Sequence, residues 1–133
     1  MKTDLSWVLD DVLKVRGARH AILVSADGLL LQRSDSIGRD DAERNAAALS
    51  TMQSLSRAVA SYVGQGHGRW RQTLQEYDGG WILLTAAGED TYLAVAAAPD
   101  VDMEALSFRM QKTTAALREA MGVAPRSDSG ASA

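Results

Sequence analysis

Residues 21–31 read Ala21-Ile22-Leu23-Val24-Ser25-Ala26-Asp27-Gly28-Leu29-Leu30-Leu31, two apolar runs with Asp27-Gly28 between them. Asp-Gly is a preferred pair for a tight two-residue turn between antiparallel strands, in which both positions take a positive φ. Neither run alternates cleanly between apolar and polar residues, a pattern typical of strands that are covered on both faces. The stretch therefore predicts a hairpin, over about residues 19–33, in a sheet with helices on both sides.

Apolar residues at helical spacing predict three helices around this sheet. The first spans about residues 5–13, with Thr3 or Asp4 as its N-cap. The longest is expected over residues 39–63, which contain neither glycine nor proline. The last begins after a cap at Asp102 and ends before Gly122.

Three further strands are predicted between the long helix and the last helix. They cover residues 70–77, which are mostly polar, and residues 81–85 and 91–96, which are apolar on both faces. The order helix, two strands, long helix, three strands, helix predicts an α/β sandwich of the α+β type. We expect one domain over residues 1–122, followed by a small and polar tail, residues 123–133, that is disordered.

The composition narrows the class of protein. The chain has 133 residues, 46% of them hydrophobic and 23% charged, as in an ordinary soluble domain. The net charge of -3 argues against a nucleic-acid partner, because such proteins carry a basic face. The absence of cysteine excludes disulfides and thiolate zinc sites. No apolar run is long enough to span a bilayer, so we expect a cytoplasmic protein without direct membrane insertion.

The chain offers no constellation of residues for catalysis. Its two histidines, His20 and His67, lack the neighbouring carboxylates that a metal or catalytic site requires. The glycines at positions 64, 66 and 68 follow a predicted helix and precede a strand, whereas a dinucleotide-binding loop follows a strand and begins a helix. We therefore expect no enzymatic activity, no metal and no cofactor.

The polar strand at residues 70–77 predicts an interaction surface, because polar strands are typical of sheet edges and an open edge can pair with another chain. The apolar arc of the long helix is also wider than one sheet face requires. In the strand, Trp70, Gln72, Leu74 and Glu76 should point to one side. A monomer with a polar edge strand is the alternative to a symmetric dimer. The predicted interface comprises Leu49, Met52, Leu55, Ser56, Val59, Trp70, Gln72, Leu74 and Glu76.

A second partner surface is predicted from aromatic and basic residues. Trp7 and Phe108 lie off the apolar stripes of their helices, and Arg69 and Arg71 flank Trp70. The aromatic rings could instead pack within the chain, since soluble proteins keep exposed aromatic patches small. The two arginines could bind an acidic partner or remain solvated.

Several short segments, taken in their order along the chain, resemble the roadblock family, which is related to dynein light chains and is widespread in bacteria. The resemblance covers Leu5 to Met121. The matching segments are Leu5-Ser6-Trp7-Val8-Leu9-Asp10-Asp11, Arg19-His20-Ala21, Val24-Ser25-Ala26-Asp27-Gly28-Leu29-Leu30-Leu31, Asp40-Asp41-Ala42-Glu43, Arg71-Gln72-Thr73, Thr85-Ala86-Ala87-Gly88 and Leu93-Ala94-Val95. The resemblance is greatest to the stand-alone bacterial members encoded beside a sensor-kinase-like protein and a small Ras-like GTPase.

This resemblance implies a five-stranded antiparallel sheet with the long helix on one face and the terminal helices on the other. It also implies a homodimer, in which the long helices pack together and the third strands join the two sheets. Family members regulate or assemble Ras-like GTPases, and some stimulate GTP hydrolysis. A GTPase activator can supply an arginine to the reaction, and the sequence offers Arg39, Arg44, Arg57, Arg69 and Arg71.

Two functions follow from the resemblance. In the first, the dimer regulates a small Ras-like GTPase. In the second, it is a scaffold that links a sensor-kinase-like protein to other products of the operon without altering GTP turnover. In both cases the protein would be cytoplasmic and could be recruited to a membrane by its partners.

Overall fold

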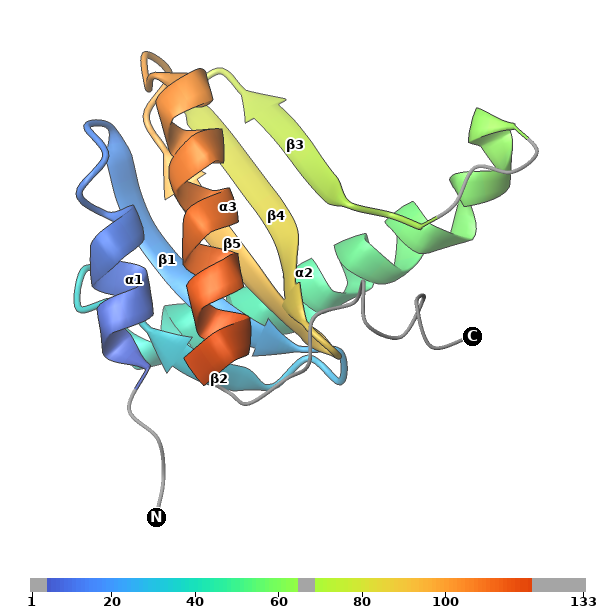
Figure 1. The fold of residues 1–133 in the computed structure, drawn as a ribbon, viewed down its shortest axis with the longest axis horizontal. Helices are drawn as coiled ribbons and strands as arrows, with labels where there is room; N and C mark the ends of the chain where they lie inside the picture. Colours follow the sequence, from blue (N-terminus) through green and yellow to red (C-terminus); the bar gives the residue numbers. More distant parts are fainter. Residues whose placement is uncertain (1–4, 65–68, 121–133) are drawn as a thin grey trace.

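The computed structural model describes residues 5–64 and 69–120. The order of its elements confirms the predicted arrangement, with one short 3-10 helix added (Figure 1). The elements are α1 (Ser6–Val12), β1 (Ala18–Ser25), β2 (Leu30–Arg33), α2 (Arg39–Ala58), the 3-10 helix η1 (Ala60–Val63), β3 (Gln72–Tyr77), β4 (Gly80–Gly88), β5 (Thr91–Ala97) and α3 (Met103–Ala120).

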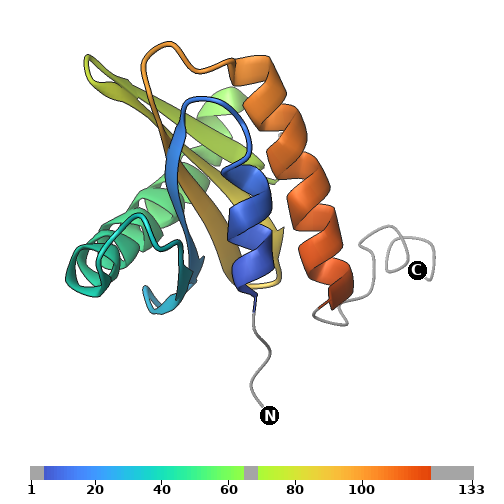
Figure 2. The ribbon, with the colours of Figure 1, turned by 90° about the vertical axis from the view of Figure 1, so that its left-hand side faces the viewer.

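The five strands form one antiparallel sheet in the order β2-β1-β5-β4-β3. Helix α2 lies on one face of this sheet, and α1 and α3 lie side by side on the other (Figures 1 and 2). The α+β sandwich implied by the family resemblance is therefore confirmed. Because β2 and β3 are the two edges of the sheet, any strand pairing with another chain has to use one of them.

The core has two halves, one on each face of the sheet. Along β1, Ala21 and Leu23 belong to the half under α1 and α3, whereas Ile22 and Val24 belong to the half under α2. Successive side chains of a strand point to opposite faces. A strand that is covered on both faces is therefore apolar throughout, which explains the missing alternation in residues 21–24.

The turn at Asp27-Gly28 differs from the predicted two-residue turn. The Gly28 N–H donates to the Ser25 carbonyl, and the Ser25 N–H donates to the Leu29 carbonyl, both at 2.9 Å. Gly28 has a φ of 87°, but Asp27 does not have a positive φ, since among the described non-glycine residues only Asp90 does. The loop is thus three residues long and ends in a glycine bulge, the second common way to join two antiparallel strands.

The long helix is shorter than predicted, because α2 ends at Ala58 and the chain continues as η1. The prediction of one helix over residues 39–63 is wrong in its last turn. Apart from Ala60, residues 59–63 are β-branched, polar or aromatic, with modest helix propensity. Val59 and Val63 are also exposed, so no packing compensates for this modest propensity.

Of the two predicted helix caps, that of α3 is confirmed, whereas the N-cap position of α1 is Leu5 rather than Thr3 or Asp4 and makes no side-chain cap hydrogen bond. The Ala105 N–H donates to the Asp102 carboxylate at 3.1 Å, which confirms the cap of α3. The predicted caps Thr3 and Asp4 and the predicted tail, residues 123–133, lie outside the described residues. In the part of the chain that is described, no helix has the length and apolar character needed to cross a membrane.

Candidate protein-interaction surface

The two edges of the sheet differ in their capacity to pair with another strand. All six residues of β3 pair with β4 in one continuous register, and β3 contains neither lysine nor proline. β2 has only four residues, and its register shifts opposite Leu23 and Val24, which leaves Leu31 as a bulge. Shortness and a bulge are devices that protect an edge from pairing. The β3 edge is therefore the one open to another chain.

The side chains of β3 divide between the two faces of the sheet. Leu74 is opposite Leu83, which lies in the core half under α1 and α3, and Thr73 is opposite Leu84, which lies in the half under α2. Directly opposite residues share a face. By alternation, Gln72, Leu74 and Glu76 share one face, as predicted, and it is the α1/α3 face.

Trp70 does not share this face, contrary to the prediction. It precedes β3, and its ring packs edge-on against Tyr92, with 5.7 Å between ring centroids, in the core half under α2. Residues 69–71 lie outside the strand, so strand alternation does not set their direction. The large indole ring therefore turns towards the apolar surroundings that α2 provides.

A chain of hydrogen bonds joins α2 to the edge strand. The Trp70 Nε1–H donates to Thr73 Oγ1 at 2.8 Å, and Ser56 Oγ donates to the Met52 carbonyl at 2.9 Å. Thr73 Oγ1 and Ser56 Oγ are 3.1 Å apart. Since the Ser56 proton is used by the carbonyl, the Thr73 hydroxyl is the donor to Ser56. These bonds fix the C-terminal half of α2 beside β3.

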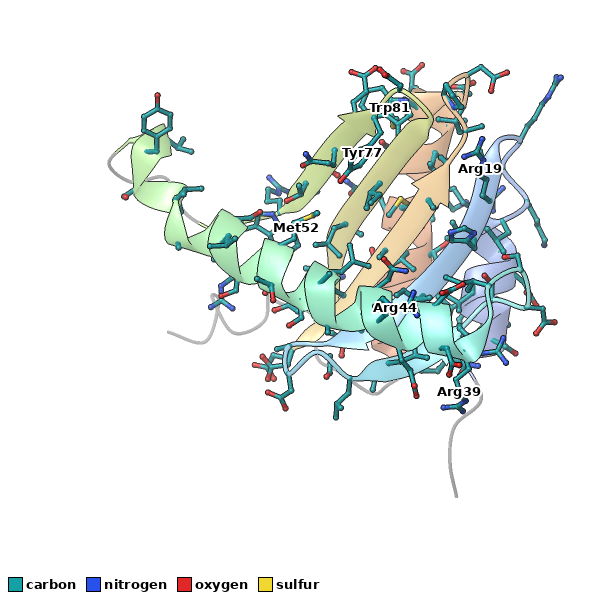
Figure 3. The ribbon with its side chains drawn as sticks, turned by 180° about the vertical axis from the view of Figure 1, so that it is seen from behind. Arg19, Arg39, Arg44, Met52, Tyr77 and Trp81 are labelled. Atoms are coloured by element: carbon teal, nitrogen blue, oxygen red, sulfur yellow. The ribbon has the colours of Figure 1, made fainter. Side chains whose placement is uncertain are left out.

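The C-terminal end of α2 extends beyond β3 and leaves apolar side chains uncovered (Figures 1 and 3). Leu55 and Val59 are exposed, and Tyr62 of η1 is 94% exposed. An open groove of about 430 Å³ runs between the helix and the edge strand, lined by Ala48, Thr51, Met52, Leu55, Ser56, Val59, Thr73 and Gln75. Exposed apolar surface of this kind, beside an open strand edge, is typical of a contact with another protein.

Leu49 has a different environment from the rest of the predicted interface. It is 8% exposed and packs in the core half under α2. Met52, one turn further along, is half-buried and labelled in Figure 3. The apolar side chains of α2 thus pack in the chain's own core as far as Leu49, whereas those further along, Leu55 and Val59, are exposed to solvent.

The structure does not bring the predicted second surface together, because Trp7 and Phe108 lie on the helices of the opposite layer whereas Arg69 and Arg71 precede β3. Trp7 on α1 and Phe108 on α3 are both exposed, and the Lys112 Nζ lies 5.6 Å from the centre of the Phe108 ring. A cation over an aromatic face is attracted by the ring electrons. Both rings therefore offer apolar surface away from the core, and their role as a partner surface stays a prediction.

The structure separates the five candidate arginines into two groups. Arg39 pairs with Glu43 at 3.2 Å and Arg44 pairs with Asp41 at 2.8 Å. Both lie in the N-terminal half of α2, away from β3 (Figure 3). The other three make no side-chain hydrogen bond or ion pair with another described residue: Arg57, Arg69 and Arg71. Arg57 adjoins Ser56, and the other two precede β3, so these three are the unpaired cations of this surface.

In the described part of the chain, no group of three or more side chains that could hold a metal ion is present. His67 lies outside the described residues, as do Gly66 and Gly68. His20 lies on β1, and its pKa is lowered from 6.5 by burial and, to a lesser degree, by the charge of Arg19. It is therefore neutral at pH 7.

This lowered pKa predicts a pH dependence of stability. Well above pH 6.5 His20 is neutral in both the folded and the unfolded state, so stability is independent of its titration there. As the pH falls below this value the unfolded chain binds the proton first, and the free energy of unfolding decreases until the folded-state pKa is passed. Urea unfolding measured between pH 7 and pH 5 should show that the free energy of unfolding falls more steeply with decreasing pH in the wild type than in His20→Gln. Equal slopes would contradict the burial of a neutral imidazole.

The family model described as the Roadblock/LC7 domain matches residues 5–97, and the chain belongs to this family. A Roadblock/LC7 domain from Streptomyces avermitilis is 28% identical, with a TM-score of 0.83 over 91% of this chain and 100% of that chain. MglB from Myxococcus xanthus is 18% identical, with a TM-score of 0.80 over 90% of this chain and 96% of that chain. The gliding protein MglB from Thermus thermophilus is 17% identical, with a TM-score of 0.76 over 90% of this chain and 92% of that chain. No curated protein matches the chain.

Proposed function

We propose that this protein is a non-catalytic homodimer that binds a small Ras-like GTPase and changes its rate of GTP hydrolysis. The observation that carries this proposal is the open β3 edge beside the exposed end of α2, in a chain of the Roadblock/LC7 family. The resemblance to stand-alone bacterial members supports the choice of a GTPase as the partner. The two MglB structures share this fold, which is consistent with that choice.

The homodimer is supported by the chemistry of the surface. A strand edge presents unpaired N–H and C=O groups, which a second copy of the same strand satisfies in an antiparallel, symmetric manner. Leu55 and Val59 are exposed and line the groove beside this edge, so a second copy paired there would cover them. The apolar surface and the open edge are thus explained by one partner.

The regulatory role is supported by the three unpaired arginines. A GTPase activator can stabilise the charge of the transition state with an arginine. Arg57, Arg69 and Arg71 make no ion pair with another residue of the described chain, so their guanidinium groups are available to an acidic or phosphate-bearing partner. Arg39 and Arg44 are already paired and serve as controls.

GTP turnover by the Ras-like GTPase encoded nearest to this chain tests the proposal. We expect the wild-type protein to change the rate of hydrolysis in single-turnover assays. Alanine substitutions at Arg57, Arg69 or Arg71 should reduce this change, by about 1,000-fold or more where the arginine enters the GTPase site. Arg39→Ala should have no effect. Unchanged turnover together with no detectable binding of the GTPase would reject the proposed function.

Assembly without an effect on turnover is the second candidate function. It is favoured by the exposed Trp7 and Phe108, because they lie on the layer of α1 and α3 and would stay accessible in a dimer built through β3. A sensor-kinase-like protein is the expected partner of this layer, and it could recruit the cytoplasmic dimer to a membrane. Co-purification with the kinase at unchanged GTP turnover, lost in Trp7→Ala or Phe108→Ala, would favour the scaffold.

A further inference from the structure

We infer that the two β3 strands of the dimer pair about a two-fold axis at Leu74, with Gln72 of each protomer opposite Glu76 of the partner subunit. This inference rests on the proposed homodimer and adds its register. The occupant of the open edge is therefore a second copy of this chain. The argument uses the faces of β3, the direction of its backbone groups and the chemistry of its side chains.

The faces of β3 restrict where the axis can lie. Directly opposite residues in an antiparallel pair point to the same face of the sheet. Leu74 lies on the α1/α3 face and Gln75 on the α2 face, so these two cannot be opposite each other across a continuous sheet. The axis must then pass through a residue rather than between two residues. The candidates near the middle of the strand are Thr73, Leu74, Gln75 and Glu76.

The backbone of β3 restricts the axis further. Tyr77 and Gly80 are opposite each other across a two-residue loop, which closes on a hydrogen-bonded pair. Along the ladder, hydrogen-bonded and non-hydrogen-bonded pairs alternate. The backbone groups of Gln72, Leu74 and Glu76 therefore point away from β4, towards the open edge. An axis at Leu74 pairs all three of these residues, whereas an axis at Thr73 or Gln75 pairs only two of them.

The side chains favour the same axis. Leu74 is 41% exposed, and an axis at this residue places it against its own copy, so both leucines lose water-accessible apolar surface. The same register places the Gln72 amide opposite the partner's Glu76 carboxylate, which can accept a hydrogen bond from it. An axis at Gln75 would place Leu74 opposite a carboxylate, and an axis at Glu76 would place two carboxylates opposite each other, which is destabilising.

Disulfide formation in single-cysteine variants tests this register, because the chain contains no cysteine of its own. Opposite Cα atoms of a hydrogen-bonded pair are about 5.5 Å apart, within the range of a disulfide. Leu74→Cys should therefore form a covalent dimer under mild oxidation. Gln75→Cys is the matched control, since its two copies would be on a diagonal of about 7–8 Å. Gln72→Cys and Glu76→Cys should cross-link when mixed and not when oxidised separately.

The outcomes separate the register from the dimer itself. Cross-linking of Leu74→Cys and of the mixed pair, without that of Gln75→Cys, supports the axis at Leu74. Cross-linking of Gln75→Cys instead, or of all variants at similar rates, overturns this register while the β3 dimer remains. No cross-link in a protein that is dimeric by light scattering overturns the β3 contact. A monomeric wild-type protein overturns the homodimer of the proposed function as well.

Discussion

Leu74→Glu is expected to convert the dimer into a folded monomer. In the inferred register the substitution places two glutamates opposite each other, with about 5.5 Å between their Cα atoms and a similar separation assumed for their carboxylates. Their repulsion is about 3 kcal/mol at an effective dielectric constant of about 20. The apolar contact between the two leucines is lost in addition. Since 1.4 kcal/mol corresponds to a factor of ten, the dissociation constant should rise by at least about 100-fold. Light scattering over a concentration series measures this change.

Leu31→Glu provides a matched control for that experiment. Leu31 is also an exposed leucine on an edge strand, at 46% exposure, but it lies at the bulge of β2. This variant should stay dimeric, and both variants should keep the circular dichroism spectrum of the wild type. Dimers of equal strength in both variants would contradict the β3 interface. Leu49→Glu is unsuitable, because Leu49 is buried in the chain's own core and a charge there would disturb the fold.

Gly80→Ala is expected to cause the largest loss of stability among the glycine substitutions. Gly80 has a φ of 150°, a conformation that residues with a side chain rarely adopt, and a Cβ there would overlap the Ala97 carbonyl oxygen. Backbone strain costs about 1–3 kcal/mol, and forcing atoms into packed space costs about as much again. The free energy of unfolding should therefore fall by roughly 2–6 kcal/mol in urea titrations.

Gly79→Ala is the neighbouring control. Gly79 does not have a positive φ, and a Cβ there would meet no atom within 4 Å. Its effect should stay within about 0.5 kcal/mol, as for most surface substitutions. Similar losses in the two variants would mean that β4 does not approach Ala97 as closely as the structure shows. The two glycine variants also test how closely the start of β4 packs against β5, and β4 is the strand to which β3 is hydrogen-bonded.

The layers of the fold could be predicted from residues 21–31 because burial on both faces leaves a direct trace in a strand. Ile22 and Leu23 are both apolar since each faces a different half of the core. The cap at Asp102 is similarly local, because its carboxylate binds an N–H only three residues away. Asp27-Gly28 marked the position of a turn, but the pair alone did not distinguish a two-residue loop from a three-residue loop with a bulge.

The candidate surface depended on contacts that local patterns do not contain. The apolar arc of the long helix looked uniform, yet Leu49 packs in the core half under α2, whereas Leu55 is exposed and lines the groove beside β3. Trp70 also turned to the face opposite Leu74, since its direction is set by Tyr92 rather than by strand alternation.

The sequence by itself therefore determined the element order, the double covering of the sheet and the absence of thiol chemistry, since these depend on composition and on periodicity within single segments. The tertiary structure decided which sheet edge is open, which arginines are unpaired and which part of α2 lacks a cover. These properties arise where segments distant in the chain meet, as in the bulge of β2 at Leu31 and the hydrogen bond between Thr73 and Ser56. Strand register and helix crossing are set by packing of the whole core, and they carry the candidate interface of this protein.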